Sequence, residues 1–170
     1  GEHGCWCKMT YYEQSAGVPL IARLPGKIKP GSVSKVNCNL IDLGPTFAEI
    51  AASKESIDVD GKSLWNVMTG VDESAGPDET FSELVELYDG YPVASAMIKH
   101  HSWKLWAYDH AQGLETALFN LADDPKELND LANDPAHKQI KDRLINKLNR
   151  WWNPKMSVAG CVQNFADINA

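Results

Sequence analysis

Three soft metal ligands, His3, Cys5 and Cys7, lie close together at the start of the sequence. Imidazole and thiolate groups in an H-x-C-x-C pattern could bind zinc or copper, or act as reactive thiols. A structural zinc site needs four ligands, however, and the next cysteine, Cys38, is distant in the sequence. Two interpretations therefore stay open: a metal- or thiol-binding module, and thiols that pack as small apolar side chains.

Two further groups of residues could serve a substrate pocket. Trp6, Tyr11 and Tyr12 could line a pocket for an organic alcohol or bind a quaternary ammonium through cation–π contact, with core packing as the alternative. His100 and His101 are adjacent, so in a strand their side chains would point to opposite faces. At most one of these histidines can point inward, and a solvated turn is the simpler interpretation.

An acidic stretch follows residue 122, and its carboxylates could suggest calcium. The spacing does not match an EF-hand loop, which needs ligands at alternate positions and a closing glutamate. We interpret the stretch as a solvated loop that caps the following helix. Its members are Asp123, Asp124, Glu127, Asp130 and Asp134.

The composition excludes several classes of protein. The chain has 170 residues and a formal charge of −7, with an isoelectric point near 5.1, so a basic nucleic-acid surface is not expected. No apolar run approaches the roughly 20 residues that span a bilayer, so no membrane partner is expected. The four cysteines are too scattered for a disulfide scaffold and are expected to be reduced. Because residues 1–4 resemble neither a start methionine nor a signal sequence, we expect a truncated chain whose localisation is unknown.

The elements that must position these residues change in character along the chain. Residues 18–24 form an apolar run that favours a strand buried on both faces, and residues 45–53 favour a short helix that begins with Pro45. The few elements before residue 70 look like the closing segments of an α/β sheet. Residues 58–77 are expected to be mostly loop.

After residue 79 the pattern favours a small α+β unit. Residues 93–99 and 103–108 are predicted strands around a turn, and residues 116–119 add a further strand. The run at 81–88 is ambiguous, because its apolar spacing fits a helix better than a strand, and we interpret it as a strand. Asp134 and Pro135 begin an amphipathic helix that Pro154 ends, and this helix should cover one face of the sheet. Residues 156–170 carry no firm signal. A structural or assembly domain that acts through this helix and tail, with a homo-oligomer as its expected form, is therefore a third hypothesis.

Five segments in order resemble the sulfatase family. Residues 1–8 read GEHGCWCK and residues 12–21 read YEQSAGVPLI, similar to the family pattern GEHGxWxK…YExSxRVPLI. NLIDLGPT at 39–46, DGKSL at 60–64 and LFNL…DPKELNDL at 118–131 match three further family strings. The resemblance is closest to choline-sulfatase-like and iduronate-sulfatase-like members. Gly17 departs from the pattern, because the family usually has arginine or a polar residue there.

The resemblance implies a fold and a reaction. The implied fold class is an α/β remnant plus an α+β unit: closing segments of an alkaline-phosphatase-like parallel sheet, then a small antiparallel sheet packed against a C-terminal helix. The corresponding domains are 1–70, the end of the catalytic α/β domain, 71–155, a small α+β subdomain, and 156–170, a tail. The implied reaction is hydrolysis of a sulfate ester by a formylglycine nucleophile beside a calcium ion or another divalent cation.

The resemblance also implies which residues this chain contributes. Lys8 and His3 are the expected substrate-binding residues for a small sulfated substrate, and Lys8 serves any tetrahedral anion, including phosphate and phosphonate esters. None of the cysteines is followed two residues later by proline, as the family's nucleophile motif requires. We therefore expect no catalytic residue, metal ligand or cofactor in this chain. The nucleophile and metal should come from the remainder of the catalytic domain, and the chain should be inactive alone.

Overall fold

Two sets of residues pack separately in the computed structural model, which describes residues 2–6, 8–53, 59–88, 91–110 and 112–168. The sheet unit combines Gly1–Gly17 with Phe81–Ala170, and the loop unit comprises Val18–Thr80. In sequence, the loop unit is an insertion between the two parts of the sheet unit. The domain limits at residues 70 and 155 follow the sulfatase resemblance and not this packing, and they stay a prediction.

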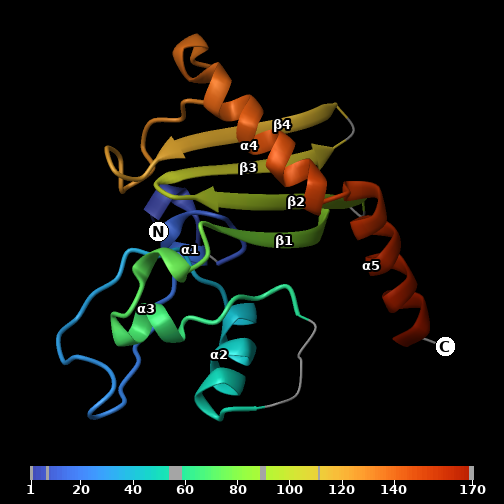
Figure 1. Ribbon diagram of the computed structural model, residues 1–170. Coiled ribbons are helices and arrows are strands. Elements are labelled where there is room, and N and C mark those ends of the chain that lie inside the picture. Colours follow the sequence, from blue (N-terminus) through green and yellow to red (C-terminus); the bar gives the residue numbers. More distant parts are fainter. Residues whose placement is uncertain (1, 7, 54–58, 89–90, 111, 169–170) are drawn as a thin grey trace. The chain divides into compact units, whose positions relative to one another are not determined.

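Four consecutive strands form one sheet in the order β1-β2-β3-β4 (Figure 1). Their bounds are Glu79–Tyr88 for β1, Tyr91–His100 for β2, Trp103–His110 for β3 and Gly113–Asn120 for β4. Strands β2 and β3 pair antiparallel, as do β3 and β4. The turn between β2 and β3 places His101 at φ 51, a left-handed conformation that histidine adopts more readily than most residues. The four predicted strands and this turn are confirmed.

Alternate residues of a strand point to the same side of a sheet. On one face of this sheet, these side chains are small or branched and apolar. The buried residues of this face are Ala94, Ala96, Ile98, Leu105, Ala107 and Leu118. Helix α4, Lys138–Trp151, crosses this face and buries Leu144 and Leu148 against it (Figure 1). The Asp134 carboxylate accepts a hydrogen bond from the Ala136 backbone N–H, and Pro135–His137 form a 3₁₀ turn that leads into α4. The predicted C-terminal helix is confirmed.

A second C-terminal helix was not expected. Helix α5 spans Pro154–Ile168, where the sequence carried no firm signal. The Asn153 side chain accepts hydrogen bonds from the backbone N–H groups of Lys155 and Met156, and Pro154 occupies the first turn, where no N–H donor is needed. The proline that ends α4 therefore also begins α5. No helix within the described ranges is both long and apolar enough to cross a membrane.

In the loop unit, residues 39–42 and residues 61–62 lie in close contact. The buried Asp42 carboxylate accepts hydrogen bonds from the backbone N–H groups of Asn39 and Lys62, at 2.7 and 2.8 Å. A Cβ at Gly61 would lie 2.1 Å from the Ile41 carbonyl oxygen, so only glycine permits this approach. The family-like strings at 39–46 and 60–64 are therefore structural, and they lead into α2 and α3. The helices and 3₁₀ turns of this unit are Leu40–Asp42, α2 at Leu43–Ile50, α3 at Trp65–Thr69 and Glu73–Ala75.

The predicted strand at residues 18–24 is wrong for this chain. These residues are irregular, with Val18 64% and Ile21 89% exposed. A buried strand of a parallel sheet needs neighbouring strands and covered faces, and the described part of the loop unit contains no strand that could pair with it. Phe47 of helix α2, Leu43–Ile50, is also exposed.

Candidate functional site

Both predicted substrate-binding residues lie on the N-terminal segment, which we define as residues 2–17. It contains a 3₁₀ turn, Glu2–Gly4, and one helical turn, α1, at Glu13–Ala16. Lys8 is exposed, and its backbone carbonyl accepts a hydrogen bond from the Ser15 hydroxyl. The His3 ring stacks on the Tyr12 ring, with centroids 3.8 Å apart and planes 6° from parallel. The segment thus holds the Lys8 backbone and the His3 ring through Ser15 and Tyr12.

Two tyrosines attach the N-terminal segment to the sheet face opposite α4. Tyr11 is 4% exposed among aromatic residues of β3 and β4, and its hydroxyl lies 3.0 Å from the Ser95 hydroxyl. Burial raises the pKa of Tyr11 well above its usual range, although the Ser95 hydrogen bond acts in the opposite direction. Tyr12 meets the Trp106 ring edge-on at 4.9 Å. These tyrosines are packing residues, and the pocket role considered from the sequence does not apply to Tyr11.

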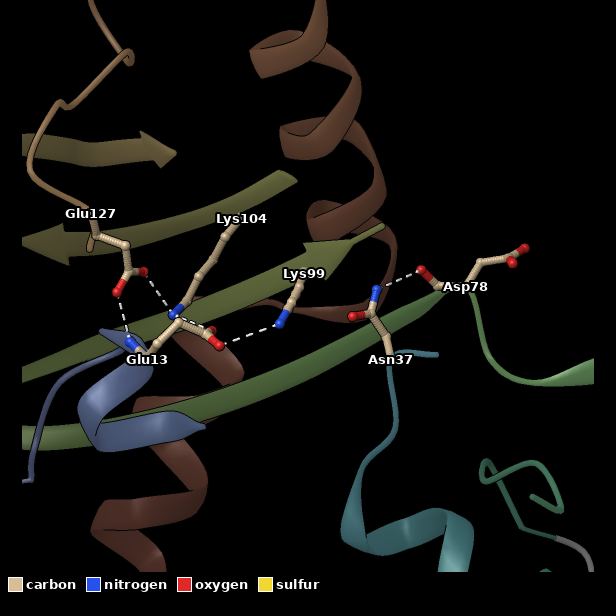
Figure 2. A network of polar contacts seen from close by, with 6 residues as sticks. All are labelled: Glu13, Asn37, Asp78, Lys99, Lys104 and Glu127. Carbon is tan, nitrogen blue, oxygen red and sulfur yellow. Dashed lines mark hydrogen bonds and ion pairs between the residues drawn. The ribbon is translucent and has the colours of Figure 1, made fainter. Parts of the chain in front are cut away.

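Four charged residues connect the N-terminal segment to β2, β3 and the loop after β4 (Figure 2). Lys104 of β3 forms ion pairs with Glu13 at 2.9 Å and with Glu127 at 2.8 Å, and the side chains of Lys104 and Glu127 are fully buried. The second Glu127 oxygen accepts the Glu13 backbone N–H at 2.7 Å. Lys99 of β2 lies 3.4 Å from the other Glu13 oxygen. We call these four residues the charge network.

The charge network resolves a conflict within the sheet. Lys99 and Lys104 are directly opposite on adjacent strands, an arrangement that is destabilising for like charges. Glu13 binds one lysine with each carboxylate oxygen, and Glu127 adds a second negative charge, so the network is neutral overall. Burial raises the pKa of Glu13, but hydrogen bonds and charge from Lys104 and Lys99 more than offset this, so the pKa lies below its usual value.

Sequence reasoning missed the charge network, although a signal for part of it was present. With a two-residue turn at His101 and Ser102, Lys99 and Lys104 must face each other, which calls for a carboxylate from outside the hairpin. Glu13 and Glu127 lie within the family-like strings at 12–21 and 118–131. Which carboxylates reach the lysines depends on tertiary packing, and spacing alone does not give it.

The described side chains do not support metal binding by His3 and Cys5 or by the acidic stretch. The Cys5 thiol points to the His3 carbonyl oxygen at 3.6 Å, and Cys7 lies outside the described residues, so the H-x-C-x-C hypothesis is not tested. Among the residues the structure describes, no three His, Cys, Asp or Glu side chains are grouped to hold a metal ion. The carboxylates of the acidic stretch bind local donors: Asp124 accepts from Leu128 and Asn129, and Asp130 from Leu118 and Ala132.

A groove of about 490 Å³ lies within the loop unit, and it contains neither Lys8 nor His3. Its lining combines apolar side chains with polar groups, among them the exposed Cys38 and the carboxylate-bearing Glu73. Such a lining offers no cluster of cations for a sulfate group. The groove lining is Val18, Leu20, Ala22, Ile28, Ser32, Val33, Ser34, Val36, Cys38, Leu64, Val67, Met68, Gly70 and Glu73.

Curated proteins similar to this chain are sulfatases. The choline-sulfatase of Rhizobium meliloti (strain 1021) is 33% identical over 144 residues, which cover 79% of this chain and 25% of that protein. Arylsulfatase K of Homo sapiens is 31% identical over 173 residues, which cover 93% of this chain and 30% of that protein. The chain therefore spans roughly a third of the length of such relatives.

Solved structures are also similar to this chain. A protein in complex with its substrate D-glucosamine-2-N,6-O-disulfate matches with a TM-score of 0.76 and 25% identity, over 88% of this chain and 31% of that one. A phosphonate monoester hydrolase from Silicibacter pomeroyi matches with a TM-score of 0.60 and 28% identity, over 75% of this chain and 27% of that one. These likenesses confirm the alkaline-phosphatase-like fold class.

The family model described as N-sulphoglucosamine sulphohydrolase, C-terminal, matches residues 1–153, from the N-terminal segment to the end of α4. The match spans all five family-like strings, including those that form the docked backbone of the loop unit and those that supply Glu13 and Glu127 to the charge network. This chain belongs to the sulfatase family and corresponds to its C-terminal part.

Proposed function

We propose that this chain completes a sulfuric ester hydrolase by presenting Lys8 and His3 to the sulfate group of a small substrate. Transfer of a sulfuryl group requires that charge on the non-bridging oxygens be neutralised. The Lys8 ammonium is a compact charge with three donors, and it is exposed on a segment anchored to the sheet. The observation that carries the proposal is this exposed cation on a backbone that Ser15 holds in place.

The nucleophile and metal of the proposed reaction come from outside this chain. Formylglycine and calcium, which the family resemblance implies, would supply the attacking oxygen and additional positive charge. Four of the described carboxylates are already engaged: Glu13 and Glu127 bind lysines, and Asp124 and Asp130 bind backbone N–H groups. The partner is accordingly the remainder of a sulfatase catalytic domain, and the chain alone should be inactive.

Hydrolysis of a chromogenic aryl sulfate tests the proposal. We expect no turnover by the 170-residue chain and turnover by the complete gene product. In that product, Lys8→Ala should lower kcat/KM by about 100-fold or more, by comparison with the loss of one fixed charge-stabilising donor. Lys138→Ala is the matched control, because Lys138 is an exposed lysine of α4 on the other face of the sheet. Unchanged kcat/KM in Lys8→Ala would contradict the proposal.

The chemical class of the substrate is decided in the same assay. The relatives include a choline-sulfatase and an N-acetylglucosamine-6-O-sulfatase, and one similar solved structure is a phosphonate monoester hydrolase. We favour a sulfate ester, because the curated relatives named above are sulfatases. Aryl sulfate, phosphate and phosphonate esters should be compared at equal concentration, and higher kcat/KM for the phosphonate would overturn the substrate assignment.

A further inference from the structure

We infer that Lys104 and Glu127 are positioning residues that hold the N-terminal segment so that Lys8 and His3 can meet the substrate anion. This inference rests on the proposed function of Lys8 and His3. It adds two residues from distant parts of the sequence, neither of which is exposed to a substrate. They act through Glu13 of the N-terminal segment, Lys104 on its side chain and Glu127 on its backbone.

The burial of the Lys104 and Glu127 charges indicates that these two residues have a specific structural role. A buried charge is costly unless it is paired and hydrogen-bonded. The side chains of Lys104 and Glu127 have no exposed area, and they pair with each other at 2.8 Å. Each also makes a second contact with Glu13: Lys104 with the carboxylate at 2.9 Å and Glu127 with the backbone N–H at 2.7 Å. The pair therefore holds one residue of the N-terminal segment at both its side chain and its backbone.

The backbone of Glu127 supports the same interpretation. Its φ of 54° lies in the left-handed region, where a non-glycine residue persists only if its surroundings hold it there. The neighbouring Asp124 accepts the backbone N–H groups of Leu128 and Asn129, which fixes the loop on the far side of Glu127. The loop after β4 is thus built to aim one carboxylate at Lys104 and Glu13.

A short chain of contacts leads from Glu13 to the two anion-binding candidates. Glu13 begins α1, and an isolated helix of a single turn is not stable in water. The Ser15 hydroxyl of this turn donates to the Lys8 carbonyl, and the Tyr12 ring, next to Glu13, stacks on His3. Loss of the Glu127 and Lys104 contacts should therefore release α1 and, with it, the positions of Lys8 and His3.

The first experiment measures amide hydrogen exchange in the 170-residue chain. In Lys104→Met and Glu127→Gln, amides of residues 9–17 should exchange at least about tenfold faster, because Lys104→Met leaves the buried Glu127 carboxylate without its cation and Glu127→Gln removes one of the two carboxylates that pair with the buried Lys104. Glu13→Gln keeps the Lys104–Glu127 pair and serves as a second variant if the others fail to fold. Ile98→Ala is the control: it weakens the same sheet from the α4 face without touching the charge network. Equal exchange at residues 9–17 in the control and the network variants would overturn the inference.

The second experiment measures kcat/KM for an aryl sulfate in the complete gene product. Lys104→Met should lower kcat/KM by about 100-fold at a temperature where the variant is fully folded, as expected for a small displacement of a binding group. Adding Lys8→Ala to Lys104→Met should cause little further loss, because both changes remove the same interaction. Ile98→Ala and Lys8→Ala should combine additively. Additive losses for Lys104→Met with Lys8→Ala would show a merely structural role and overturn the inference.

The two experiments separate failure of the inference from failure of the proposed function. If the complete product hydrolyses aryl sulfate and needs Lys8, but Lys104→Met has no effect on kcat/KM, the positioning role is wrong and the function stands. If the complete product has no such activity, or Lys8→Ala does not alter it, the proposed function fails and the role in substrate binding fails with it. Hydrogen exchange then still decides whether Lys104 and Glu127 anchor the segment.

Discussion

The sheet unit and the loop unit obtain their order in different ways. The sheet unit buries a continuous apolar core between its sheet and α4, and it adds the neutral charge network on the opposite face. The loop unit is held by the Asp42 carboxylate and the Thr46 hydroxyl, which accept hydrogen bonds from backbone N–H groups, while residues such as Ile21 and Val33 are about nine-tenths exposed. The difference indicates that the order of the sheet unit depends on a buried apolar core, whereas the order of the loop unit depends on polar contacts with its backbone; large apolar side chains are exposed in both units.

The largest expected effect is in the core of the sheet unit. Leu148 of α4 is 1% exposed against the sheet, so Leu148→Ala should lower the free energy of unfolding by about 2–5 kcal/mol through lost burial and a cavity. Urea unfolding followed by circular dichroism measures this loss. Val33→Ala in the loop unit is the matched control, because Val33 is 91% exposed. Equal losses for the two variants would remove the contrast between the units.

A smaller, local effect is expected from the docked backbone of the loop unit. Gly61→Ala should cost about 1–3 kcal/mol, because its Cβ would overlap the Ile41 carbonyl oxygen and the two segments would have to separate. Faster amide exchange at residues 39–46 and 62–64, with unchanged exchange in β3, would support this. Gly44→Ala is the control, since a Cβ there meets no atom within 4 Å and alanine favours a helix. A uniform change across both units would contradict the local docking.

Acid should weaken the charge network in a defined direction. Because the pKa of Glu13 is lower in the folded protein than in the unfolded chain, its stabilising contribution is complete above about pH 4.3, the ordinary value for glutamate. It is lost as the pH falls below this value and through the folded pKa. The difference in unfolding free energy between the unaltered chain and Glu13→Gln should therefore be constant near neutrality and shrink below about pH 4. Parallel pH curves would argue against an ionised Glu13 in the network.

The smallest effect is expected on the exposed apolar surface of the loop unit. Ile21→Ser should alter the free energy of unfolding of this chain by less than about 0.5 kcal/mol, because the side chain is 89% exposed. In the complete gene product the same change should be markedly destabilising if the rest of a catalytic domain covers this residue. Thermal unfolding of both forms makes the comparison. A large loss in the 170-residue chain alone would mean that Ile21 is packed within it.

Local patterns predicted the sheet unit well. Alternating apolar residues, a short polar turn and the Asp134–Pro135 helix start each act within a few residues, so β2, β3 and α4 were predicted correctly. The segment at 18–24 has the composition of a buried strand, but a strand needs partners, and the described loop unit supplies none. Helix α5 was missed because Pro154 was interpreted only as the end of α4.

The residues of the candidate site were also predicted only in part from the sequence. Lys8 and His3 were found through family-like strings, and their substrate role stays a prediction. Glu13, Lys104 and Glu127 were missed because their contacts join residues up to 114 positions apart in sequence. Such contacts depend on the register of the sheet and on the loop after β4, and no local pattern of charge fixes both.

The ion pair between Glu13 and Lys104 also closes a loop of the chain that is 91 positions long. The entropic cost of closing a flexible loop rises only with the logarithm of its length, and each doubling adds about 0.6 kcal/mol. Relatives could therefore gain or lose tens of residues in the irregular parts of this interval, outside β1 and β2, with little penalty to this contact. Insertions in that interval would leave the contact of the N-terminal segment with β3 intact.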